Sequence, residues 1–152
     1  MESKKMSSGE FQQLENVRLL RESGWYASSG ARLYKTRTTS QNGMLSVTLT
    51  AYAKEIKLTL MKASIAGQEL EIVKERTYPM GDILEAASLG MQFLLEEFVG
   101  KTVVVCWHPT MGQPTRVVGI FKTAYYDRLS LTNGIDSIEV KLLFAPKVEL
   151  AD

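Results

Sequence analysis

The chain has 152 residues, a length typical of one domain, with 45% hydrophobic and 23% charged residues as in an ordinary globular protein. Its net charge of +1 selects no class of partner, although residues 1–62 are mainly basic and residues 63–100 mainly acidic. No apolar stretch approaches the roughly 20 residues of a membrane-spanning helix, and none follows Lys4 and Lys5 as a signal peptide requires. Cys106 is the only cysteine, which excludes an intrachain disulfide and favours a cytoplasmic location.

The chain is expected to form a flexible tail over residues 1–9, one α+β domain over 10–146 and a second tail over 147–152. A short amphipathic helix is predicted after Ser7 and Ser8, which together with Glu10 are typical of a helix start. Its apolar face begins at Phe11, and Gly24 ends it.

Four strands joined by short turns are predicted between Ala31 and Tyr78, forming an antiparallel meander. The segment 44–53 alternates most clearly, with Leu45 and Val47 on one face and Ser46 and Thr48 on the other. The meander should therefore have one apolar and one polar face.

A helix is predicted over residues 82–99, because Asp82 and Glu85 have the spacing of a capping box and Gly100 is a good stop. It is apolar all round except for one narrow stripe, which consists of Glu85, Ser88, Gln92 and Glu96. Such a helix must be covered on most sides, by the apolar face of the meander and by a further surface, for which a second subunit is one possibility.

Three more strands are predicted after the helix, over 102–107, 115–126 and 137–144. The expected fold is thus an α+β protein with one antiparallel sheet of about seven strands, the helix 82–99 packed on it and an accessory N-terminal helix.

Motifs for catalysis are missing from the sequence. Cys106 and His108 share a face if residues 102–108 form a strand, but no other Cys or His is available to complete a metal site. No phosphate-binding glycine loop and no hydrolase motif is present. We therefore predict a protein that is not an enzyme, with no cofactor and no metal.

Aromatic and basic residues alternate in the segment 25–37 and recur near residue 55, a pattern typical of surfaces that bind single-stranded nucleic acid. Rings stack on bases while cations contact phosphates, so the sequence predicts sequence-tolerant binding of single-stranded RNA or DNA on the polar face of the meander. The predicted nucleic-acid-binding residues are Trp25, Arg32, Tyr34, Lys35, Arg37, Tyr52, Lys54 and Lys57. Two alternatives remain open: Trp25 and Tyr26 could instead fill the gap after the first helix, and the surface could contact another protein.

The order of four meander strands and a capped apolar helix, from Arg32 through Gly100, resembles the ββββα unit of the PUR and Whirly single-stranded nucleic-acid-binding proteins. The segment YPMGDILEAASLGMQFLLEEFVG is similar to the closing helix of such a unit. The resemblance implies a strand-binding sheet face and homo-oligomerisation. This chain departs from those families because no second helix follows the last three strands.

A second resemblance concerns the segment TRVVGIFKTAYYDRLSLTNGIDSIEVKLLFAP, whose layout is similar to the closing strands of phage tail-tube and secretion-tube subunits. The likeness rests on the connection 127–136 and on the alternation of Ile138, Val140, Leu142 and Phe144. It implies the alternative function of a self-assembling structural protein.

Overall fold

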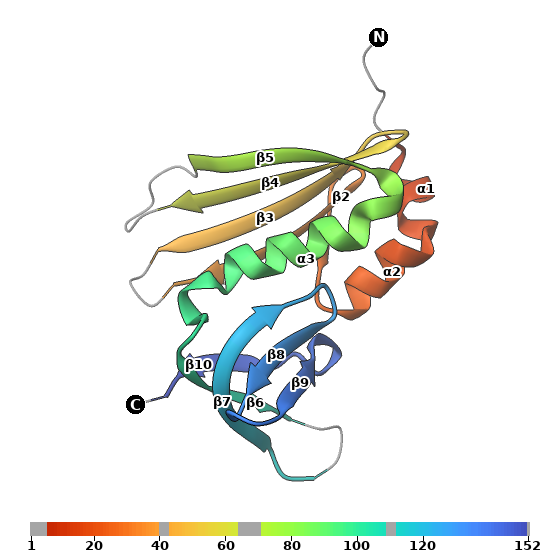
Figure 1. The fold of residues 1–152 in the computed structure, drawn as a ribbon. Coiled ribbons are helices and arrows are strands. Elements are labelled where there is room, and N and C mark those ends of the chain that lie inside the picture. The colour runs from red at the N-terminus through yellow and green to blue at the C-terminus, as the bar shows by residue number, and fades with distance from the viewer. Residues whose placement is uncertain (1–5, 40–42, 64–70, 109–111, 152) are drawn as a thin grey trace.

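The computed structural model describes residues 6–39, 43–63, 71–108 and 112–151, which form short helices and two antiparallel five-stranded sheets (Figure 1). The first half contains α1 (Ser8–Gln13), α2 (Glu15–Glu22), β1 (Tyr26–Ser28), β2 (Arg32–Thr38), β3 (Met44–Ala51), β4 (Glu55–Ala63) and β5 (Glu71–Pro79). The second half contains η1 (Met80–Asp82), α3 (Ile83–Leu94), η2 (Glu96–Phe98), β6 (Thr102–Trp107), β7 (Thr115–Ala124), β8 (Arg128–Thr132), β9 (Ser137–Lys141), η3 (Leu142–Phe144) and β10 (Lys147–Leu150).

The first sheet has the strand order β1-β2-β3-β4-β5, so each strand pairs with its neighbour in the chain. This arrangement confirms the predicted meander and adds β1, which pairs only with residues 32–34 of β2. Val47, Leu49 and Ala51 are fully buried on one face, as their alternation predicts. We call this side the inner face and the opposite side the outer face.

Helix α3 covers the inner face and lies between the two sheets (Figure 1). The middle of its polar stripe contacts the second sheet, whereas Glu85 and Glu96 at the two ends are exposed to solvent. Ser88 Oγ accepts a hydrogen bond from the Tyr126 N–H (2.9 Å), and Gln92 Nε2 donates to the Ala124 carbonyl (3.2 Å). The further surface that covers this apolar helix therefore belongs to the same chain.

The second sheet has the order β10-β6-β7-β8-β9, in which the last strand of the chain, β10, pairs with β6, the first strand after α3. Its buried side chains, such as Val105, Phe121 and Leu131, join those of the first sheet and α3 in one hydrophobic core. No helix within the described ranges has the length and apolarity to cross a membrane.

Several predicted boundaries need correction. The single sheet of about seven strands is wrong, because the meander and the later strands form separate sheets on either side of α3. The N-terminal helix is two helices, and the helix predicted over 82–99 ends at Leu94, followed by the 3-10 turn η2. Strand β8 lies in the predicted irregular connection 127–136, and the strand predicted over 137–144 stops at Lys141.

The two predicted tails also contain structure. Residues 147–150 were assigned to a C-terminal tail but pair with β6 as strand β10. Ser8 and Gly9 begin α1, whose N-cap Ser7 accepts a hydrogen bond from the Glu10 N–H. Residues 1–5 and the predicted turn at 41–42 lie outside the described residues.

Candidate nucleic-acid interface

Two tyrosines form an aromatic pair on the outer face, opposite α3. Tyr26 on β1 lies directly across from Tyr34 on β2, and their ring centroids are 5.6 Å apart. The side chains are 62% and 37% exposed, so one ring surface remains open to solvent. Because exposed rings offer stacking platforms to bases of any type, this pair is the centre of the candidate interface.

Three arginines lie near these rings, Arg32 on the strand of Tyr34 and the other two beside Tyr26. Arg32 lies two residues before Tyr34 on β2 and therefore shares its outward direction. Arg18 and Arg21 of α2 line an open hollow of about 470 Å³ together with Tyr26 and one acidic residue, Glu22. Arg21 Nη1 donates to Gln12 Oε1 at 3.1 Å, which orients its guanidinium. We call these five residues, Arg18, Arg21, Tyr26, Arg32 and Tyr34, the aromatic–basic surface.

Hydroxyl groups continue this surface across the sheet. Thr48 on β3 lies opposite Tyr34, and Thr59 on β4 lies opposite Thr48, so the three side chains form one row across the outer face. Hydroxyls at such positions donate to sugar or phosphate oxygens. The outer face thus provides rings, cations and hydrogen-bond donors together.

Only part of the predicted residue set lies on this face. Arg32, Tyr34 and Lys57 point outward, and the register aligns Arg32, Thr50 and Lys57 in one row. Lys57 is already paired with Glu75 (3.4 Å), which reduces its availability to a phosphate. Tyr52 and Lys54 lie at the β3–β4 turn, where Tyr52 is half-buried and Lys54 exposed.

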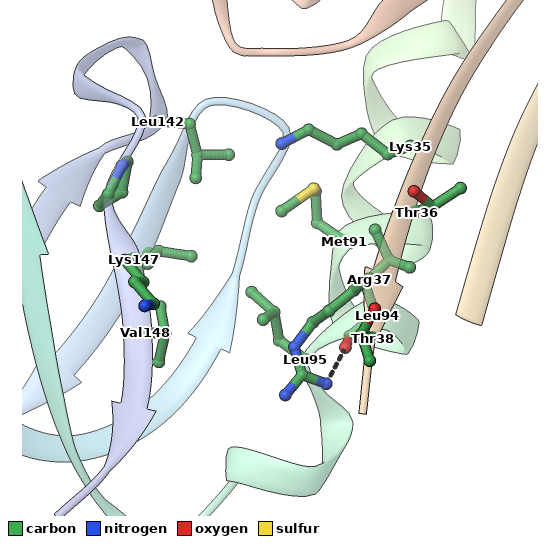
Figure 2. Close-up of a pocket in the computed structure, with 12 residues that line it drawn as sticks. Lys35, Thr36, Arg37, Thr38, Met91, Leu94, Leu95, Leu142, Lys147 and Val148 are labelled. Carbon is green, nitrogen blue, oxygen red and sulfur yellow. Dashed lines mark hydrogen bonds between the residues drawn. The ribbon is translucent and has the colours of Figure 1, made fainter. Parts of the chain in front are cut away.

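Three predicted residues lie elsewhere. Trp25 is only 2% exposed and packs against α3 at Gly90, so its ring is not available for stacking on a base. Of the two residues that could fill the gap after the first helix, Trp25 is buried there and Tyr26 is exposed. Lys35 and Arg37 point to the inner face, because they alternate with Tyr34 along β2. They line a cleft between the two sheets instead (Figure 2).

Arg37 has a structural role in that cleft. Its Nη1 donates to the Leu94 carbonyl at the end of α3 (3.1 Å), and its Nη2 forms an ion pair with Glu97. The guanidinium carbon also lies 4.4 Å from the ring centroid of Phe98. With these partners Arg37 ties β2 to the end of α3 and leaves little for a phosphate.

Lys35 has a different environment. Burial among apolar groups lowers the pKa of its ammonium from 10.5 to about 8, since a charge is poorly solvated there. No carboxylate within the described residues forms an ion pair with it. Lys35 is therefore mostly protonated at neutral pH but lacks a counter-ion.

The remaining candidate pair gains no catalytic geometry. Cys106 is half-buried near the end of β6 and His108 is exposed after it. Across the described residues, no group of three or more Cys, His, Asp or Glu side chains could hold a metal ion.

The predicted binding set leaves out Tyr26, Arg18 and Arg21. A usable signal was present for Tyr26, because consecutive strand residues face opposite sides and only one of Trp25 and Tyr26 can be buried. For Arg18 and Arg21 the helical period places both on the exposed side of α2, but nothing local shows that this side adjoins the sheet.

Comparison with protein-family models, with curated proteins and with solved structures finds no match for this chain.

Proposed function

We propose that the protein is a non-catalytic, cytoplasmic binder of single-stranded nucleic acid that uses the aromatic–basic surface. The observation that carries the proposal is the exposed Tyr26–Tyr34 pair, whose rings lie 5.6 Å apart beside Arg32. One ring surface stacks on a base while the arginines contact the flanking phosphates. RNA and DNA both fit, because stacking and phosphate contacts do not read the sugar.

The proposed residues differ from the sequence-based set in one ring and in the cations, with Tyr26 in place of the buried Trp25. Lys35 and Arg37 are replaced by Arg18 and Arg21, since the former face the inter-sheet cleft. Thr48 and Thr59 extend the path of the strand across the sheet. The resemblance to the PUR and Whirly families remains a prediction that concerns the same sheet face.

The test is a fluorescence anisotropy titration of the full chain with a labelled 12-nucleotide single strand at low salt. Tyr34→Ala should weaken binding by about fivefold to a hundredfold, as expected for loss of one stacked base. Tyr34→Phe should bind normally, because the ring is kept. Arg32→Ala should weaken binding more than its matched control Arg116→Ala, which removes an exposed arginine from the second sheet.

Salt dependence separates this proposal from a protein-contact surface. If Arg18, Arg21 and Arg32 each neutralise one phosphate, the logarithm of the affinity should fall with the logarithm of salt concentration with a slope of about −2. No affinity at low salt, or equal losses in the Arg32 and Arg116 variants, would refute the proposal.

A second candidate function is self-assembly, favoured by an apolar patch on the second sheet. Val118 and Ile120 project from the same side of β7 and are 50% and 40% exposed. Val104 lies opposite Val118 on β6 and extends the patch. An exposed cluster of this kind is typical of a contact between copies of a chain.

Self-assembly predicts a mass above that of the monomer in light scattering, and rings or tubes in electron micrographs if the assembly resembles a tail tube. Val118→Asp should shift the population toward monomer. Ile135→Asp is the matched control, since Ile135 is 91% exposed and lies outside the patch. A monomer at high concentration in the unmodified protein would remove this candidate.

A further inference from the structure

The outer edge of β2 is only partly paired. β1 covers β2 only from Arg32 to Tyr34, because the residues before β1 belong to the end of α2. There Gly24 has a φ of +93° and its N–H donates to the Arg21 carbonyl. Residues 35–38 of β2 therefore have β3 on one side and no described strand on the other.

The hydrogen-bond register shows which backbone groups are left over. Ala51 N–H donates to the Ala31 carbonyl and Thr39 N–H donates to the Gly43 carbonyl, so the odd-numbered residues of β2 point their backbone groups toward β3. The even-numbered residues point away from β3. Thr36 and Thr38 thus direct an N–H and a carbonyl each to the open edge, and both residues are exposed.

A cleft of about 350 Å³ lies along this edge, between the two sheets (Figure 2). Met91 and Leu94 of α3 form its apolar base together with Leu95, which directly follows the helix. The opposite wall comes from the second sheet, through Leu142 of η3 and residues 146–148 at β10. A short segment of chain could therefore enter beside β2 and bury apolar side chains against α3 and Leu142.

The cleft also contains Lys35, whose ammonium has no ion-pair partner among the residues that the structure describes. Figure 2 shows the Lys35 side chain extending across the cleft toward the side of Leu142. The other two cations of the lining have partners, Arg37 with Glu97 and Lys147 with Glu149. A carboxylate next to Lys35 would supply the missing counter-charge and restore its pKa toward the ordinary value of 10.5.

We propose that the cleft binds an extended acidic peptide segment of a partner protein, which adds as a strand to the open edge of β2 formed by residues 35–38. Backbone hydrogen bonds to Thr36 and Thr38 hold the segment, and the side chains that point inward give specificity. The inward side chain nearest Lys35 is acidic. The inward side chain two residues away, near Leu94, is apolar, because Arg37 is already paired at that end.

The test uses the full chain and a fluorescein-labelled peptide with the sequence Thr-Leu-Thr-Glu-Thr-Leu-Thr, in which Glu and Leu share one face. A single added strand buries little area, so we expect a Kd on the order of 100 µM. The same peptide with Lys in place of Glu should bind at least about tenfold more weakly, since it loses a charge-assisted contact.

Two variants locate the contact. Lys35→Met removes the charge but keeps a side chain of similar length, and it should weaken binding of the Glu peptide about tenfold. The control Lys62→Met, at an exposed position on β4, should leave binding unchanged. Thr36→Pro removes an N–H that points away from β3, so it should weaken binding while cooperative unfolding is retained. If Thr36→Pro fails to fold, the Lys35 and Lys62 variants still decide the proposal.

Amide hydrogen exchange provides an independent measurement. The Thr36 and Thr38 amides should exchange rapidly in the free protein and slowly with saturating Glu peptide. Three results would each overturn the proposal: equal affinity for the Glu and Lys peptides, no saturable binding up to about tenfold above the expected Kd, or slow exchange of both amides in the free protein. If decanoate perturbs the Lys35 resonances and the peptide does not bind, the cleft takes a small carboxylate instead, and the peptide proposal is wrong.

Discussion

Replacement of Gly90 by alanine tests whether α3 packs as closely on the first sheet as the structure shows. A Cβ at Gly90 would lie 2.6 Å from Val47 Cγ1 and 3.3 Å from Trp25 Cη2, both in the core. Such a distance to Val47 is shorter than carbon atoms tolerate, so either the helix or the strand must move. We expect Gly90→Ala to destabilise the protein.

Two opposing effects set the magnitude. Alanine favours a helix over glycine by about 1 kcal/mol, which alone would raise the free energy of unfolding. Overpacking a core by one methyl group costs about 1–3 kcal/mol, and the upper half applies here because Val47 is β-branched, fully buried and held in a central strand. The net change should be a loss of about 1–2 kcal/mol in the free energy of unfolding.

Urea unfolding followed by circular dichroism measures this change by linear extrapolation. Gly9→Ala is the control, since Gly9 is also helical but nothing lies within 4 Å of its added Cβ, and it should be neutral or stabilising. In a Val47→Ala background the cost of Gly90→Ala should largely disappear. An increase in stability in the native background, or an unchanged cost beside Val47→Ala, would refute the close packing.

Three further perturbations test the described contacts. The pKa of Lys35 is about 8 in the folded protein and 10.5 in the unfolded chain, so the unfolded chain binds more protons between these pH values. The free energy of unfolding should therefore rise from pH 8 to 10.5. Urea titrations at several pH values measure this rise, which Lys35→Met should abolish. Arg37→Ala removes the ion pair with Glu97 and the contact with Phe98, and should lower the free energy of unfolding by about 2–3 kcal/mol. Arg37→Lys should restore little of this stability, because an ammonium lacks the planar donor geometry of the guanidinium. Asn133→Ala removes the Oδ1 acceptor of two backbone N–H groups in the β8–β9 turn and should cost about 1 kcal/mol by the same measurement, whereas Asn133→Asp should cost less.

The two proposals make independent predictions about neighbouring residues of one strand. Tyr34 faces outward and should affect oligonucleotide binding alone, while Lys35 faces the cleft and should affect peptide binding alone. The pair therefore provides an internal control for both experiments. If either substitution abolished both activities, an effect on folding would be the simpler explanation, and circular dichroism would detect it.

Local patterns in the sequence determined most of the first sheet. The alternation at residues 44–51 predicted both the strand and its buried face. The same period of two places Tyr34 on the opposite face from Lys35 and Arg37, so the predicted binding set wrongly joined residues of two faces. This information is local, because a strand repeats every two residues whatever it pairs with. The apolar helix was likewise predictable from its local pattern, although Asp82, the predicted cap, makes no side-chain capping hydrogen bond.

Strand partners and covered surfaces were decided only by the tertiary structure. The pairing of β10 with β6 joins residues more than 40 positions apart, and nothing in the segment 147–150 distinguishes an edge strand from a tail. The sequence did not show what covers the polar stripe of α3, from which Ser88 and Gln92 bind backbone groups at and just after the end of β7. A sequence states which side chains share a face, but whether that face meets solvent, a helix or a second sheet depends on contacts distant in the chain. For that reason Lys35 was predicted on an open surface and lies in a cleft.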